Sequence, residues 1–231
     1  MRVLIVDQCS GSKSFPDSAP VYGVEEIDNH GIDELREESP ITIPARELYD
    51  GRQQRFVDDA VVQLRDDGHT VDRLYVSAGF GLVDEETRLP PYEATFREMD
   101  AATAEERART FGVTEELISS VADGVPYDVV FFPLGDDYVG AMDLDRVLDA
   151  FPSESLGVLF NRETVAAEYD RLTSLAARTA EAEAHGTITV AIKGQYLKNF
   201  AARVGDETPS LSELAELCTR TDSEQIGFDD F

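Results

Sequence analysis

Apolar and polar positions alternate along the chain in a pattern that predicts an α/β protein. Short apolar runs predict five strands, at 2–7, 73–77, 128–133, 156–160 and 187–192. Apolar residues at helical spacing predict helices at 44–49, 52–65, 101–121, 139–150, 162–183, 195–203 and 210–219. The segment 15–43 is expected to be irregular, apart from a short acidic helix near 31–37. Because strands and helices alternate, we expect a mostly parallel central sheet with helices on both faces.

The length of 231 residues predicts a single α/β domain, 1–231. Its motif-bearing core is expected at about 1–140, followed by C-terminal helices within about 195–219 and an acidic tail at 220–231. No apolar run reaches the roughly 18 residues of a membrane-spanning helix, so no membrane segment is expected. The short apolar start, which ends in Asp7, is typical of a first strand and not of a signal peptide, which favours a cytoplasmic protein.

Charge is the most unusual feature of the composition. The chain carries 47 acidic and 20 basic side chains, a net charge of −27, and its only lysines are Lys13, Lys193 and Lys198. Such a lysine-poor, acid-rich composition is typical of a halophile that accumulates salt, where screening shortens the range of self-repulsion. A surface that mimics nucleic acid or binds cations is the alternative. A local basic patch would still permit nucleic-acid binding.

Two cysteines and three histidines are too few and too scattered to form a disulfide framework or a metal-ligand cluster. No metal and no cofactor is therefore expected.

Three of the predicted strands end in small and polar residues. The first leads into 9–14 (CSGSKS), the second into 77–81 (SAGFG) and the third into 135–138 (GDDY), while Lys193-Gly194 follows the fifth. In a parallel sheet these ends lie at one edge, and ligands of open α/β sheets bind in the crevice beyond it. We therefore expect a ligand crevice at this edge.

The stretch 74–92 (LYVSAGFGLVDEETRLPPY) is predicted to form one wall of the crevice. Gly79 and Gly81 permit a sharp turn and a close approach of another group. The segment Pro90-Pro91-Tyr92 is stiff and cannot continue a helix or a central strand.

The loop after the first strand combines hydroxyls, a glycine and a lysine. Ser10, Lys13 and the backbone N–H groups are suited to holding an anion, although the spacing matches neither a Walker A loop nor a GxGxxG loop. Cys9 is a candidate nucleophile only if a nearby base or cation lowers its pKa; the alternative is a buried structural thiol.

Several other side chains are open to a functional and a structural interpretation. Asp136, with its neighbour Asp137, is a candidate general base or metal ligand, and otherwise a helix cap or a solvated loop acid. Arg46 opposes the dipole of its predicted helix, which suggests an anion or carboxylate partner. Tyr49, Phe80, Tyr92 and Tyr138 are candidates for stacking on a base, with packing in the core as the alternative.

Several of these sequence motifs resemble those of the peroxide-stress YaaA family and its related uncharacterised domains. PARELY (44–49) is similar to their ARxLY-like helix start, and 75–96 is similar to their strand ending in S-x-x-x-GL, followed by a spacer and PY. The corresponding residues are Ala45, Arg46, Leu48, Tyr49, Ser77, Gly81, Leu82, Pro91 and Tyr92. The opening 9–13 is similar to the C-S-x-x-K start of the uncharacterised relatives, whereas YaaA itself opens differently. Gly135 and Tyr138 resemble a later G-x-x-Y segment.

The resemblance covers about residues 1–140. It implies an architecture related to uracil-DNA-glycosylase-like folds, with links to DNA binding and to protection against oxidative damage. It adds to the expectation that the crevice holds a base or a nucleotide, with nucleic acid or a nucleotide as the partner. Lys13, Arg46 and Lys193 would then face phosphate, Ser10 and Ser77 would form hydrogen bonds, and Tyr92 or Tyr138 would stack.

Three functions remain open from the sequence. An enzyme would carry out N-glycosidic or base-exchange chemistry, with Asp7 or Asp136 stabilising a developing oxocarbenium charge. A non-catalytic DNA-binding protein would lose affinity steeply with salt. A nucleotide sensor would be stabilised by a mononucleotide and not by oligonucleotides.

Overall fold

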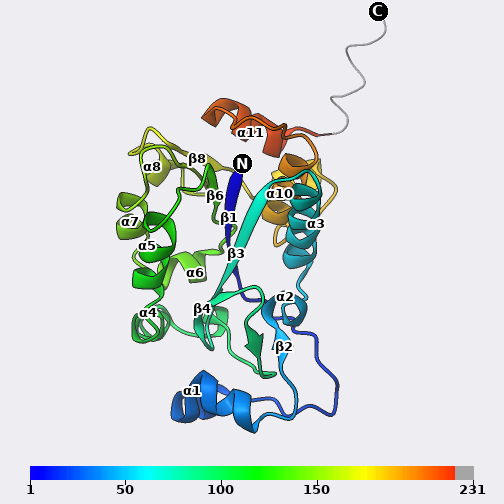
Figure 1. Cartoon of the computed structure of the whole chain (residues 1–231), viewed down its shortest axis with the longest axis vertical. Coiled ribbons are helices and arrows are strands. Elements are labelled where there is room, and N and C mark those ends of the chain that lie inside the picture. Colours follow the sequence, from blue (N-terminus) through cyan, green and yellow to red (C-terminus); the bar gives the residue numbers. More distant parts are fainter. Residues whose placement is uncertain (222–231) are drawn as a thin grey trace, which may run out of the picture.

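A six-stranded sheet forms the centre of the computed structural model, which describes residues 1–221 (Figure 1). Its order is β4-β3-β1-β6-β7-β8. The strands are β1 (Arg2–Gln8), β3 (Thr70–Ser77), β4 (Gly81–Asp84), β6 (Val129–Phe131), β7 (Leu156–Phe160) and β8 (Leu172–Leu175). All neighbours pair in parallel except β3 and β4. The predicted α/β class with a mostly parallel sheet is confirmed. Of the acidic tail predicted at 220–231, residues 222–231 lie outside the described residues.

Strand β1 is buried on both faces, as its continuous apolar run predicts for a central parallel strand. Val3 and Ile5 point into one hydrophobic cluster, whereas Leu4 and Val6 point into the other. The side chains alternate because successive residues of a strand face opposite sides of the sheet.

One face of the sheet is covered by α3 (Arg52–Asp66), α10 (Ile192–Ala201) and α11 (Leu211–Thr219) (Figure 1). Helix α3 buries an apolar stripe at helical spacing, which includes Val57, Val61 and Leu64. Helix α10 packs directly on α3. A Cβ atom on Gly194 would lie 2.6 Å from the carbonyl oxygen of Gln53, so only glycine permits this approach.

The helices on the other face are shorter than predicted. The helix expected at 101–121 is two helices, α4 (Ala101–Thr110) and α5 (Val113–Ala122), since Gly112 between them has a left-handed φ of 66°. The helix expected at 139–150 is likewise two, α6 (Asp136–Gly140) and α7 (Leu144–Asp149).

Two further predictions were wrong. The long helix expected at 162–183 is instead α8 (Glu163–Ala166), strand β8 and α9 (Thr179–Ala184). Strand β8 pairs with β7, and Gly157 makes room for Leu172: a Cβ atom on Gly157 would lie 2.4 Å from the Leu172 Cδ2 atom. The strand expected at 187–192 is a turn that leads into α10, and its apolar residues Ile188 and Val190 are exposed.

A smaller unit lies at one end of the molecule (Figure 1). It contains α1 (Val24–Glu38), α2 (Ala45–Leu48) and a two-stranded antiparallel sheet of β2 (Ile43–Pro44) and β5 (Arg88–Leu89). Helix α1 is longer than the helix predicted at 31–37, and it is kinked at Gly31, where φ is 73°. A short 3-10 helix, η1 (Phe96–Glu98), leads from this unit toward α4. Within the described residues, no helix combines the length and apolar character needed to cross a membrane.

Candidate functional site

A cavity of about 500 Å³ lies beyond the carboxyl ends of the parallel strands. In the sheet, β1 lies between β3 and β6: the chain goes from β1 to β3 on one side of it and later to β6 on the other side. The direction in which strands are added therefore reverses at β1, and ligands of open α/β sheets bind at such a point. The lining residues lie at or just after the ends of β1, β6, β7 and β8, or come from η1, the first turn of α3, and the start of α10 with the turn before it. They are Gln8, Cys9, Gly11, Gln53, Thr95, Arg97, Glu98, Gly135, Asp136, Asp137, Tyr138, Asn161, Ala177, Thr189, Val190 and Lys193. Five of the predicted site residues are among them: Cys9, Gly135, Asp136, Tyr138 and Lys193.

The segment that leaves β6 holds three of the lining side chains in place. The Gln53 side chain on α3 donates from Nε2 to the Pro133 carbonyl at 2.8 Å, and Lys193 on α10 donates to the carbonyl of Leu134. The Gly135 N–H donates to Gln8 Oε1 at 2.6 Å. Three elements that are distant in sequence are thereby fixed to consecutive residues, 133–135. We call Gln8, Gln53 and Lys193 the anchored trio.

Lys193 is the cationic member of the anchored trio. Burial lowers its pKa to about 8; the negative charge of Asp136 opposes this shift, and the positive charge of Arg162 adds to it. Arg162 itself pairs with Asp136 at 2.8 Å, so that carboxylate is already engaged at the rim of the cavity. Lys193 is therefore a proton-labile cation near neutral pH, facing a ligand-sized space.

Asp7 lies behind the cavity, not in its lining. Its side chain is fully buried and pairs with Arg73 at 2.8 Å. Its Oδ1 atom accepts hydrogen bonds from Gln53 Nε2 at 2.8 Å and from the Gln8 backbone N–H at 2.8 Å. A carboxylate satisfied in this way orients the Gln53 amide and has no free face for a substrate.

Cys9 and Tyr138 meet at the floor of the cavity. The Cys9 Sγ atom lies 3.0 Å from the Tyr138 hydroxyl, which also donates to the Cys9 carbonyl at 3.1 Å. Burial raises the pKa of Tyr138, and the neighbouring Cys9 adds to the shift. Tyr138 thus acts as a neutral donor that ties α6 to the end of β1.

Lys13 and Ser10 turn toward the protein and do not line the cavity. The Lys13 ammonium donates to the carbonyl of Ser10 at 3.0 Å and lies 4.4 Å from the centre of the Tyr92 ring. Burial lowers its pKa. The Ser10 hydroxyl accepts from the Ser12 N–H at 3.0 Å and closes the loop. The loop after β1 is therefore held together by its own polar groups.

The predicted wall of the crevice is a buried polar cluster. Tyr92 is wholly buried, and its hydroxyl lies 2.7 Å from that of Tyr49 and 2.8 Å from that of Ser77. Gly79 admits the ring of Tyr92, since a Cβ atom there would lie 2.6 Å from a ring carbon. Gly81 turns the chain from β3 to β4 with a φ of 74°. None of these residues lines the cavity, so stacking of Tyr92 or Tyr49 on a ligand base has no support from this arrangement.

Arg46 is also distant from the cavity lining. It lies on α2 and forms ion pairs with Glu86 at 2.5 Å and with Glu47 at 3.3 Å. Its carboxylate partners belong to the protein, which accounts for a cation in the first turn of a helix.

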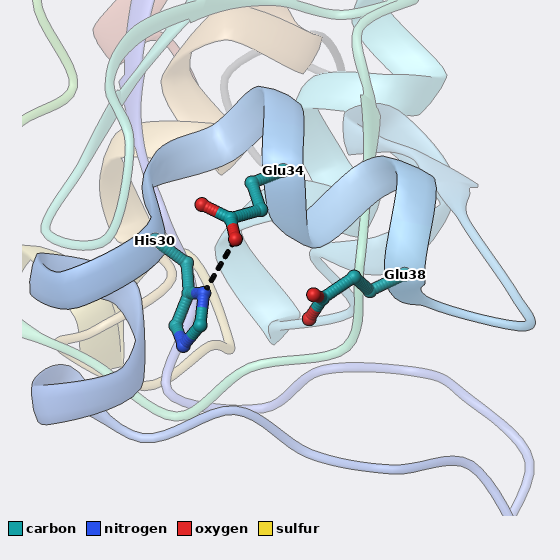
Figure 2. Close-up of side chains that lie close together, drawn as sticks. All are labelled: His30, Glu34 and Glu38. Atoms are coloured by element: carbon teal, nitrogen blue, oxygen red, sulfur yellow. Dashed lines mark ion pairs between the residues drawn. The ribbon is translucent and has the colours of Figure 1, made fainter.

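Among the described side chains, one group has ligand atoms close enough together to share a metal ion: His30, Glu34 and Glu38 on α1. Figure 2 shows them on either side of the kink, with His30 Nδ1 3.1 Å from Glu34 Oε1. All three are exposed and none lines the cavity. Exposed side chains of this kind are common in so acidic a chain and carry no argument for a metal.

Sequence reasoning missed Gln8, Gln53, Arg97 and Asn161. Asn161 follows β7 directly, so the same strand-end argument applies to it; its φ is 56°, and its amide accepts from and donates to the backbone of Ala177. Gln8 follows Asp7 at the end of β1 and carries the same signal. Gln53 and Arg97 carry none, because a glutamine on a helix and an arginine in a loop are typical of solvent-facing positions.

Two cations of the lining have no acidic partner. Among the described residues, neither Lys193 nor Arg97 has a carboxylate within ion-pair distance, whereas Lys198 pairs with Asp59 at 2.7 Å. Other described cations, among them Lys13, Arg52 and Arg88, also form no ion pair, but of the described cations only Lys193 and Arg97 line this cavity.

Comparisons with protein-family models and with curated proteins find no match to this chain. The fold and the cavity define an α/β protein with a ligand-sized cavity at the point where its strand order reverses. The resemblance to the YaaA family stays a prediction.

Proposed function

We propose that the cavity binds a nucleotide and that the chain is a nucleotide-associated protein of the YaaA-like group. The observation that carries this proposal is the pair of cations, Lys193 and Arg97, that face the cavity without a carboxylate partner among the described residues. An ammonium and a guanidinium both bind phosphate through charge-assisted hydrogen bonds. A role in DNA protection or in the response to oxidative stress rests on the family resemblance alone.

Size and position support a small ligand. A volume of about 500 Å³ lies within the range of about 300–1,000 Å³ that is usual for small-molecule sites. The cavity also lies where open α/β sheets bind their ligands. Its lining is mixed in charge, since it includes Glu98, Asp136 and Asp137 as well as the two cations. Such a lining favours a mononucleotide over a long polyanion, which needs an extended basic surface.

An N-glycosidic activity is the second candidate, because Asp136 lies at the rim with its side chain 84% exposed. Asp7 is unsuited to this role, since its carboxylate is enclosed. The enzyme would lose turnover in Asp136→Asn and keep it in Glu154→Gln, an exposed acid that is not part of the cavity lining. Equal loss in both variants, or in neither, would contradict this assignment.

The experiment that tests the proposal is thermal stability in molar KCl against free bases, nucleosides, mononucleotides and short DNA. We expect a mononucleotide to raise the Tm, because a ligand that binds only the folded state stabilises it. The rise should disappear in Lys193→Met and remain in Lys198→Met, which removes an exposed lysine outside the cavity. A rise caused only by DNA would favour a nucleic-acid-binding protein. No rise with any of these compounds would overturn the proposal.

A further inference from the structure

The orientation of the Gln53 amide is fixed by two acceptors. Its Nε2 atom donates to Asp7 Oδ1 at 2.8 Å and to the Pro133 carbonyl at 2.8 Å. Neither a carboxylate nor a carbonyl oxygen can donate, so the amide nitrogen has to face them. Both N–H groups are then used. The group that Gln53 can still offer in the cavity is its carbonyl oxygen, Oε1, which accepts no hydrogen bond from any described residue.

The Gln8 amide is fixed in the opposite sense. Its Oε1 atom accepts from the Gly135 N–H at 2.6 Å, and a backbone N–H can only donate. The oxygen is therefore engaged, and the amide nitrogen remains. Within the described part of the chain, nothing accepts a hydrogen bond from Gln8 Nε2. Gln8 consequently presents a donor in the cavity, where Gln53 presents an acceptor.

Two amides of fixed and opposite polarity select for a partner with the complementary arrangement. A nucleobase edge has this arrangement: an N–H donor lies beside a carbonyl or ring-nitrogen acceptor, as in N3–H beside O4 of uracil or N6–H beside N1 of adenine. Glutamine amides read base edges in this way in nucleic-acid recognition. A phosphate offers only acceptors and would leave the Gln53 oxygen without a donor, so the Gln53 oxygen favours a base edge over a phosphate.

We infer that the cavity recognises a nucleobase by its edge, with Gln53 accepting from the N–H of the base and Gln8 donating to the adjacent acceptor. This inference rests on the proposed nucleotide-binding function and adds to it the part of the ligand that is read. Lys193 and Arg97 remain for the phosphate. In this arrangement the two amides form the base subsite and the two cations form the anion subsite.

Isothermal titration calorimetry in molar KCl tests the inference on the unaltered protein. The ligands are UMP and AMP, their N3-methyl and N6,N6-dimethyl counterparts, and ribose 5-phosphate. We expect methylation of the donor to weaken binding about tenfold or more, because it removes the N–H group that would donate to the Gln53 oxygen. We expect ribose 5-phosphate to bind more weakly than either nucleotide. Equal affinity for a nucleotide and its methylated counterpart would overturn the inference.

A variant reverses the polarity of one amide. Gln8→Glu keeps an oxygen for the Gly135 N–H but replaces the cavity donor with an acceptor, so nucleotide affinity should fall at least tenfold. Gln63→Glu makes the same change of charge on the exposed side of α3 and should leave affinity unchanged. Equal losses in both variants would show a general charge effect and would contradict base reading.

The outcomes separate the inference from the function on which it rests. If ribose 5-phosphate binds as tightly as the nucleotides, the anion subsite stands and the base subsite fails. If neither nucleotide nor ribose 5-phosphate binds, the proposed function fails and the inference with it. Should Gln8→Glu not fold, the methylated ligands still decide the question, because they are measured on the unaltered chain.

Discussion

Arg73 and Asp7 form an ion pair that is almost completely removed from solvent. Their Nη2 and Oδ2 atoms are 2.8 Å apart, and the side chains are 1% and 0% exposed. The pair links β3 to β1 directly behind the cavity, and the other oxygen of Asp7 orients Gln53. An enclosed carboxylate is thus stabilised by an arginine on one side and organises a ligand-facing amide on the other.

Replacing Arg73 should strongly destabilise the fold. In Arg73→Met the Asp7 carboxylate would be buried without a counter-ion, and breaking such a pair typically costs about 3–5 kcal/mol. The free energy of unfolding, measured by guanidinium chloride denaturation, should fall by about this amount. The double variant Asp7→Asn with Arg73→Met should recover part of the loss, because no charge then remains buried.

Arg55→Met is the matched control for Arg73→Met. Arg55 pairs with Asp50 at 2.7 Å, but both side chains are largely exposed, so solvent takes over the interaction. The fall in the free energy of unfolding should therefore be far smaller in Arg55→Met than in Arg73→Met. Comparable losses in the two variants would contradict the special role assigned to the buried pair.

Nucleotide affinity should fall as the pH rises above about 8. Burial lowers the Lys193 pKa to about 8, so its ammonium is lost at higher pH. AMP is the ligand for this test: the second ionisation of its phosphate, near pH 6, is already complete and its adenine does not ionise between pH 7 and pH 9.5, so its charge stays constant. Calorimetric affinity measured from pH 7 to pH 9.5 should show this decrease. In Lys193→Arg the charge persists, and affinity should be nearly independent of pH over this range.

The same lysine should affect stability with the opposite sign. The folded pKa of about 8 is lower than the usual value of 10.5. Between these values the unfolded chain binds more protons than the folded chain, so stability rises with pH. Relative to Lys193→Met, the unaltered protein should therefore gain stability from pH 8 to pH 10. A constant difference over this range would mean that Lys193 is not buried as the structure describes.

Gly194→Ala should displace α10 from α3. The new Cβ atom would lie 2.6 Å from the Gln53 carbonyl oxygen and 3.0 Å from the Phe56 Cβ atom, and backbone cannot move aside without cost. Overpacking of this kind typically costs about 1–3 kcal/mol, which denaturation would measure. Gly140→Ala is the control, because a Cβ atom on Gly140 would meet no heavy atom within 4 Å and its φ is not positive. A neutral Gly194→Ala would show that the two helices are not in contact here.

The two cysteines should differ in reactivity in the folded protein. Both are free and buried, but Cys9 lines the cavity, whereas Cys218 lies on the buried face of α11 and burial raises its pKa. A small thiol reagent such as methyl methanethiosulfonate should modify Cys9 first, and a bound nucleotide should slow this reaction. Mass spectrometry would locate the label, with the unfolded protein as the control for equal modification. Faster labelling of Cys218 would contradict this placement of the cavity.

The strands that are predictable from the sequence are those with continuous apolar runs. β1 and β7 are buried in the sheet and carry such runs, so their local signal agrees with their environment. The only apolar residues of β8 are Leu172 and Leu175, and its strand state depends on pairing with β7 and on the space that Gly157 leaves for Leu172. No local pattern carries that information.

The site was predictable to a similar extent. Cys9, Gly135 and Lys193 line the cavity: the strand-end rule placed the first two, and Lys193 reaches it from the start of α10, not from the end of a fifth strand. The rule could not show that Tyr92 turns inward over Gly79, because that contact joins two turns of the chain. Nor could it find Gln53, because the direction of its amide is set by Asp7 on β1 and by Pro133 just after β6, both distant in sequence.

The anchored trio also has a kinetic consequence. Gln8, Gln53 and Lys193 are held by the β6 exit before any ligand arrives, so folding has already restricted their rotamers. Immobilising such a side chain on binding would cost about 0.5–1.5 kcal/mol each. A rigid receptor of this kind associates without a slow rearrangement. A substitution that breaks one of these three hydrogen bonds should therefore mainly shorten the residence time of the ligand, with little change in its association rate.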